Sequence, residues 1–150
     1  MRLQSFLTIA AIAAISGCRP QRAPVTASGQ LTGAVAPRLA VEQFLGAIRA
    51  QDLQALSVVW GTEKGAIRDD RRVSRSELEQ RELIMIRCFT HSEFRIVDEQ
   101  QALEGRRVLK VALTNRGRVK EPLFHTVMGP SDRWYVENAE IAAVKEFCQQ

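Results

Sequence analysis

The sequence predicts an α+β domain in which N-terminal helices pack on one face of a curved antiparallel sheet of about four strands, with a short helix at the end of the chain. Before Cys88, apolar residues recur at the three- and four-residue spacing of helices. After Cys88 they alternate with a period of two, and Gly, Pro and Asn separate the runs. Because helical and strand patterns occupy separate halves of the domain, we expect the helices to cover one sheet face.

Two short helices are predicted first. Pro37 precedes an apolar periodic run from Leu39 to Ile48, as is common near a helix start. Asp52 is a suitable N-cap for a second helix that runs to Trp60. The glycines at 61 and 65 end this helix, and residues 65–73 are expected to form a charged loop.

A third helix follows a capping box. Ser74 and Glu77 have the spacing of this motif, with Ser76 and Glu79 as an alternative register. The helix extends to Phe89 and carries one apolar stripe with a second group of aliphatic residues beside it. The stripe is Leu78, Met85 and Phe89, and the residues beside it are Leu83, Ile84 and Ile86.

The second half of the domain predicts a meander. Strands are expected at residues 94–97, 108–114, 119–128 and 133–141. Residues 115–118 are a hairpin turn, residues 129–132 a second turn, and residues 142–148 a closing helix.

The N-terminus has the pattern of an export signal. Arg2 precedes an apolar run of about a dozen residues, which is shorter than the roughly 20 needed to span a bilayer. The run ends in Ile15-Ser16-Gly17-Cys18, which resembles the lipobox of bacterial lipoproteins. This resemblance implies cleavage before Cys18 and lipidation of its sulfur and amino group. An ordinary secretory signal and an uncleaved anchor helix remain alternatives.

These observations divide the chain into a signal peptide at 1–17, a flexible tether at 18–37 and a single domain at 38–150. We expect the protein to be held on the periplasmic side of the bacterial envelope through acyl chains on Cys18. Arg19 stands where an Asp often retains lipoproteins in the inner membrane, so the outer membrane is slightly favoured.

The net charge of +4 comes from closely interleaved acids and bases, which argues against a nucleic-acid partner. One mostly unopposed basic group could contact anionic head groups, with an ordinary solvated surface as the alternative. Its members are Arg106, Arg107, Arg116, Arg118 and Lys120.

Lipidation of Cys18 would leave Cys88 and Cys148 as the remaining cysteines. An even number in an oxidising compartment predicts a disulfide between them. A metal site is not expected, because His91 and His125 lack ligand spacing and no Cys-x-x-Cys occurs.

Residues 41–56 (VEQFLGAIRAQDLQAL) resemble the opening helix pair of the nuclear transport factor two and ketosteroid-isomerase-like superfamily. Residues 133–137 (RWYVE) are similar to the penultimate strand of small lipoproteins with that fold. The resemblance implies a cone-shaped pocket, but it does not distinguish an enzyme from a binding protein.

Four residues are candidates for lining such a pocket: Trp60, His125, Trp134 and Tyr135. Their alternative role is ordinary packing in the core and at its rim. Alternation places Trp134 and Val136 on one strand face and Tyr135 on the other. No residue set suggests catalysis, a cofactor or a metal.

The leading hypothesis is a non-catalytic lipoprotein that binds a small apolar ligand or a partner protein. One alternative is an isomerase or dehydratase that uses His125 or Asp98 as a base. Another is a structural subunit of an envelope complex, with the pocket filled by the domain's own side chains.

Overall fold

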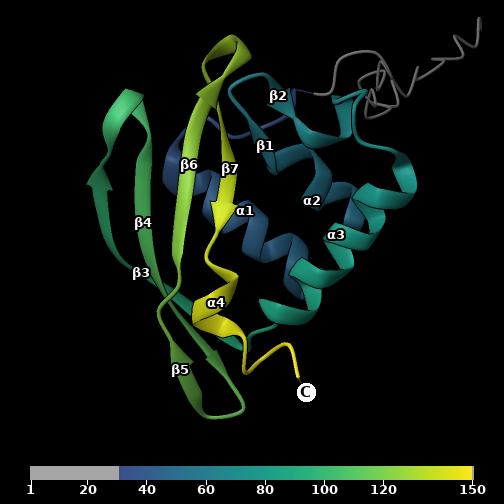
Figure 1. Ribbon diagram of the computed structural model, residues 1–150. Helices are drawn as coiled ribbons and strands as arrows, with labels where there is room; N and C mark the ends of the chain where they lie inside the picture. The colour runs from purple at the N-terminus through teal and green to yellow at the C-terminus, as the bar shows by residue number, and fades with distance from the viewer. Residues whose placement is uncertain (1–30, 150) are drawn as a thin grey trace, which may run out of the picture. The chain divides into compact units, whose positions relative to one another are not determined.

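A computed structural model describes residues 31–149 (Figure 1). The predicted α+β class is confirmed: three helices lie on one side of an antiparallel sheet, and a short helix follows the last strand. The predicted signal peptide, Cys18 and most of the predicted tether lie outside the described residues. Within residues 31–149 no helix has the length and apolar character needed to cross a bilayer.

The first two helices begin and end where the sequence predicts. Helix α1 (Pro37–Ala50) starts with proline in its first turn and ends at Gln51, which adopts a left-handed conformation with φ of 55°. The Asp52 carboxylate accepts a 2.9 Å hydrogen bond from the Ala55 N–H and so caps α2 (Leu53–Val59).

Between α2 and α3 the prediction of a charged loop is wrong for its first half. Strand β1 (Gly61–Thr62) pairs with β2 (Gly65–Ala66), and the 3₁₀ turn η1 (Ile67–Asp69) follows. Gly65 makes this tight hairpin possible because its φ of +120° is open to glycine and strained for other residues.

Helix α3 (Arg75–Cys88) is capped by the Ser74 hydroxyl, which accepts a hydrogen bond from the Glu77 N–H at 3.2 Å. The predicted apolar face of α3 is only partly right. Met85, Ile86 and Phe89 are buried, and Leu78 packs at the edge of the core. Leu83 and Ile84 are each 52% exposed, whereas Glu82 is only 4% exposed.

The main sheet has five strands where about four were expected. In sheet order they are β3 (Glu93–Gln101), β4 (Arg107–Asn115), β6 (Leu123–Gly129) and β7 (Arg133–Ala139), with β5 (Arg118–Lys120) also paired to β4. Pro122 divides the predicted strand 119–128 into β5 and β6, because proline has no N–H to donate to a ladder.

Short turns connect these strands. The predicted hairpin turn at 115–118 is confirmed, with positive φ at Arg116 and Gly117. The 3₁₀ turns η2 (Leu103–Gly105) and η3 (Pro130–Asp132) connect β3 to β4 and β6 to β7. Helix α4 (Ile141–Val144) is shorter than the predicted helix at 142–148, and hydrogen-bonded turns continue to Cys148.

The predicted disulfide between Cys88 and Cys148 is confirmed. It joins the last residue of α3 to the chain that follows α4, across a sequence separation of 60 residues.

The ordered domain begins before residue 38. Ala34 is fully buried and exchanges two backbone hydrogen bonds with Trp134, each of 2.8 Å. The Gly33 N–H also donates to the Val58 carbonyl at 2.7 Å. The last residues of the predicted tether are therefore part of the domain, because they cover the free edge of β7.

Candidate functional site

The predicted pocket residues do not converge on one cavity. Trp60 and Trp134 belong to the main hydrophobic core between helices and sheet, while Tyr135 packs with Ala66 and Val127 in a separate cluster. His125 is half-buried and lies opposite Asn138 in the β6–β7 ladder. Both tryptophans and Tyr135 therefore pack in the hydrophobic interior, which is the alternative role that the sequence left open for them.

Three glycines pack closely against the ring of Tyr135. A Cβ at Gly33, Gly61 or Gly129 would approach its ring to 2.8–2.9 Å, closer than side chains normally pack. The hydroxyl shares a 2.8 Å hydrogen bond with the Thr32 hydroxyl. A ring enclosed on so many sides has no surface left to orient a ligand.

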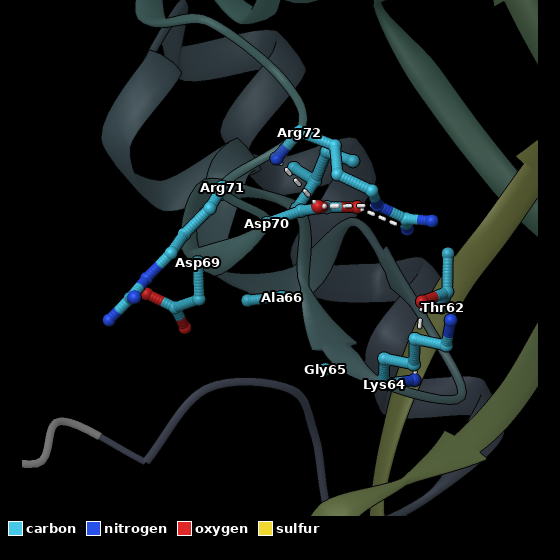
Figure 2. Close-up of a pocket in the computed structure, with 9 residues that line it drawn as sticks. Thr62, Lys64, Gly65, Ala66, Asp69, Asp70, Arg71 and Arg72 are labelled. Carbon is cyan, nitrogen blue, oxygen red and sulfur yellow. Dashed lines mark hydrogen bonds and ion pairs between the residues drawn. The ribbon is translucent and has the colours of Figure 1, made fainter.

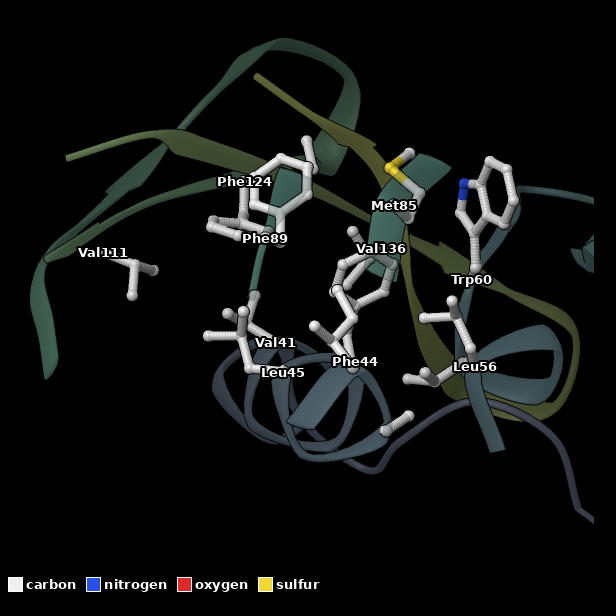
Figure 3. Packing of buried hydrophobic residues seen from close by; sticks show 14 of the residues in the cluster. Val41, Phe44, Leu45, Leu56, Trp60, Met85, Phe89, Val111, Phe124 and Val136 are labelled. Atoms are coloured by element: carbon white, nitrogen blue, oxygen red, sulfur yellow. The ribbon is translucent and has the colours of Figure 1, made fainter. Parts of the chain in front are cut away.

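The space under the sheet is filled by phenylalanines. Phe89 and Phe124 have ring centroids 5.4 Å apart, and Phe44 lies 5.9 Å from Phe124 and 6.4 Å from Phe89 (Figure 3). All three side chains are fully buried. A cone-shaped pocket of the kind that the resemblance implies is thus occupied by the domain's own core.

The two residues considered as a general base, His125 and Asp98, do not lie in a common site. Asp98 is exposed on β3, and β4 separates it from His125 on β6. Glu137 binds both Nε and Nη2 of Arg106, at 2.7 and 3.0 Å. These hydrogen bonds with Arg106 lower the pKa of Glu137, so its carboxylate is a poor proton acceptor.

The basic group predicted from the sequence is largely neutralised. Arg106 pairs with Glu137 and Glu104, and Arg118 and Lys120 both pair with Glu146. Three of the five basic residues in this group thus form ion pairs with glutamates distant in the sequence. This weakens the case for a basic membrane-facing patch.

Two pockets flank the segment that links η1 to α3. The first, with a volume of about 340 Å³, lies against the β1–β2 hairpin (Figure 2). In its wall the Asp70 carboxylate accepts three hydrogen bonds, from Nε and Nη2 of Arg72 at 2.9 and 2.7 Å and from the Arg72 backbone N–H at 3.0 Å. These bonds hold the pKa of Asp70 well below its usual range, so the pair is a closed ionic link within the loop.

The second pocket has a volume of about 460 Å³ and is formed by α2, the 68–73 segment and the first half of α3. Glu82 lines it, yet Oε1 of this buried carboxyl has no hydrogen-bond partner among the described residues. Burial, with a smaller contribution from the neighbouring Glu79, raises the pKa of Glu82 to about 7. The Nε2 of His91 is likewise buried without a hydrogen-bond partner among the described residues, but His91 does not line this pocket.

Sequence reasoning missed Glu82, although a signal for it was present. The predicted stripe of Leu78, Met85 and Phe89 passes through position 82, four residues after Leu78 and three before Met85. A carboxyl at a core-facing position of a helix indicates either a buried partner or a function.

An apolar groove lies on the far end of α3. Leu83, Ile84 and Ile141 line it together with the Cys88–Cys148 disulfide, and its volume is about 430 Å³. In residues 31–149, no cluster of His, Cys, Asp and Glu is arranged to hold a metal ion.

No protein-family model matches the chain, and no curated protein sequence is significantly similar to it.

Proposed function

We propose that this protein is a lipid-anchored, non-catalytic binding protein of the bacterial envelope that contacts a partner protein through its outer surface. The anchor rests on the Ile15-Ser16-Gly17-Cys18 motif behind the apolar leader. The Cys88–Cys148 disulfide supports an oxidising compartment, because such bonds are rare in the reducing cytosol.

The observation that carries the binding part of the proposal is the filled interior. Phe44, Phe89 and Phe124 occupy the space beneath the sheet where a cone-shaped pocket would hold a small apolar ligand. The candidate bases His125 and Asp98 lie on strands separated by β4, which argues against the isomerase alternative. Recognition is therefore assigned to the exterior of the domain.

The surface best suited to a partner protein is the groove on α3. Two adjacent aliphatic side chains, Leu83 and Ile84, are half exposed beside Ile141 and the disulfide. Exposed apolar side chains that cluster around a depression are typical of protein contact sites.

Two experiments test this function. Cys18→Ser should move the protein from the membrane fraction to the soluble periplasm, and unchanged partitioning would contradict the anchor. Co-purification from detergent-solubilised envelopes should then recover a stoichiometric partner with the wild-type chain.

Leu83→Ser should abolish that recovery. Leu103→Ser is the matched control, because Leu103 is 88% exposed and lies in the β3–β4 connection, away from the groove. Equal loss of the partner from both variants, or no partner with the wild type, would contradict the proposed surface.

A further inference from the structure

The second pocket differs from an ordinary surface depression because its wall carries a buried carboxyl. Glu82 projects from the middle of α3 and is 4% exposed, and its Oε1 makes no hydrogen bond among the described residues. Leaving a buried polar atom unpaired costs free energy and therefore needs an explanation, and a ligand that pairs with the carboxyl is the explanation that its place in a pocket wall favours.

The pocket has charges of both signs. Glu79 lies one turn before Glu82 on the same helix, and both residues line the pocket. Three arginines also line it: Arg68, Arg71 and Arg75. Arg68 lies 3.7 Å from Asp69, whereas no ion pair joins Arg71 or Arg75 to another residue of the 31–149 segment.

The arginines do not neutralise Glu82. The charge that acts on its carboxyl is that of Glu79, which opposes ionisation. The pocket thus has an acidic part on α3 and, at Arg71 and Arg75, guanidinium groups with no ion pair to another described residue. Its two other acids already have partners, because Asp69 lies 3.7 Å from Arg68 and Asp70 binds Arg72. The apolar part of the pocket wall is formed by Leu53, Val73 and Leu78.

We propose that this pocket binds a small zwitterion, whose ammonium group pairs with Glu82 and Glu79 and whose carboxylate pairs with Arg71 or Arg75. The volume of about 460 Å³ lies within the range of small-molecule sites and suits a short amino acid or peptide with free ends. A simple cation would leave the arginines unpaired, and a simple anion would leave Glu82 unpaired. This site is distinct from the α3 groove and does not rest on the proposed partner protein.

The test is calorimetric titration of the full chain in a non-ionic detergent at about pH 8, where a carboxyl with a pKa near 7 is ionised. The probes share a six-carbon body: 6-aminohexanoate carries both charges, hexylamine only the ammonium, and hexanoate only the carboxylate. We expect 6-aminohexanoate to bind about tenfold or more tightly than either singly charged probe, as one additional charged contact predicts. Trialanine, a zwitterion with peptide groups between its ends, shows whether the site prefers a peptide or a free amino acid.

Three variants assign the two charges. Glu82→Gln should weaken 6-aminohexanoate by about tenfold and leave hexanoate unchanged, since only the ammonium contact is lost. The double variant Arg71→Gln/Arg75→Gln should weaken 6-aminohexanoate and hexanoate but not hexylamine. Glu77→Gln is the matched control, because Glu77 lies on α3 and pairs with Arg81 outside the pocket.

Equal affinity for all three probes, unchanged affinity in Glu82→Gln, or no binding of any zwitterion up to about 10 mM would overturn the proposal. Each variant is first compared with wild type by circular dichroism and thermal unfolding. If Glu82→Gln does not fold, the double arginine variant tests the proposal, and unchanged binding of 6-aminohexanoate by that variant would overturn it.

Discussion

Removing the charge of Glu82 should stabilise the protein above about pH 4.5, and the gain should grow until about pH 7. The carboxyl is buried, and its pKa rises from an ordinary 4.5 to about 7 in the folded domain. Between these two values the folded state holds a proton that the unfolded chain releases. Stability therefore falls as the pH rises through this window, because the unfolded state binds fewer protons there.

The size of this effect follows from the two pKa values. The difference between them means that the free energy of unfolding of the wild type is about 3 kcal/mol lower above about pH 7 than it is near pH 4. Glu82→Gln keeps the shape of the protonated acid and cannot ionise. We expect the variant to exceed wild type by up to about 3 kcal/mol at pH 8, and to match it near pH 4 apart from a constant offset.

Urea unfolding of the full chain with its disulfide intact measures this difference. With a slope near 2 kcal/mol per M, the midpoint of Glu82→Gln should exceed that of wild type by roughly 1.5 M at pH 8. Taking the difference between variant and wild type at each pH cancels the effect of carboxyls that do not interact with Glu82, including Glu137, whose lowered pKa acts in the opposite direction in acid. Glu77→Gln measures the general effect of removing a carboxylate from α3. The same midpoint difference at pH 4 and pH 8 would refute the reasoning, because a burial penalty on the charged form must depend on pH.

Four further substitutions test the packing and the disulfide. Gly61→Ala should destabilise the folded domain by about 1–3 kcal/mol, since the new Cβ would lie 2.3 Å from the Gly65 carbonyl oxygen and 2.9 Å from the Tyr135 ring. Gly46→Ala has open space around the new Cβ inside α1 and should instead stabilise the domain by about 0.5–1 kcal/mol. Equal shifts of the melting temperature in the two variants would contradict the packing around Gly61. Phe124→Ala should cost about 3–5 kcal/mol in urea unfolding, and a cost near zero would mean that the space under the sheet is not filled as described. Reduction of the disulfide, or Cys148→Ser, should remove about 4 kcal/mol, the value for closing a loop of this length, and an unchanged unfolding midpoint would contradict that role.

Much of the fold was predictable because its signals are local. The caps at Asp52 and Ser74 and the turn at Gly117 each act within a few residues, and all three are found in the structure. The disulfide was predictable from the number of cysteines and the expected compartment.

The errors arise where distant residues decide the outcome. The last residues of the predicted tether carry no hydrophobic period, and they are ordered because Ala34 pairs with Trp134, about a hundred residues away in the sequence. The register of β7 shifts at a bulge: Val136 and Asn138 lie opposite consecutive residues of β6, and no β6 residue lies opposite Glu137. Simple alternation from Val136 would place Ala139 on the outer face, yet Ala139 belongs to the main core.

The candidate site was less predictable than the fold. The family resemblance implied a pocket, and Trp60, Trp134 and Tyr135 were candidates to line it. Large rings also fill small cores well, and these three are buried in the two hydrophobic clusters. Leu83 and Ile84 were expected beside the apolar stripe of α3, but they are half exposed and the neighbouring Glu82 takes the buried position. Which face of α3 turns inward depends on α1, α2 and the 68–73 segment together, and helical spacing alone cannot give that orientation.

Helix α3 combines features that affect stability in opposite directions. Its buried Glu82 costs about 3 kcal/mol when ionised, and the disulfide at its last residue contributes about 4 kcal/mol. For a small domain with a net stability of about 5–15 kcal/mol, both are large fractions of the total. The disulfide offsets the cost of the charge, so the domain can keep an unpaired carboxyl in the wall of a pocket. Because the two contributions add, reduction should remove a similar free energy at every pH and should leave the domain least stable above about pH 7, where Glu82 is ionised.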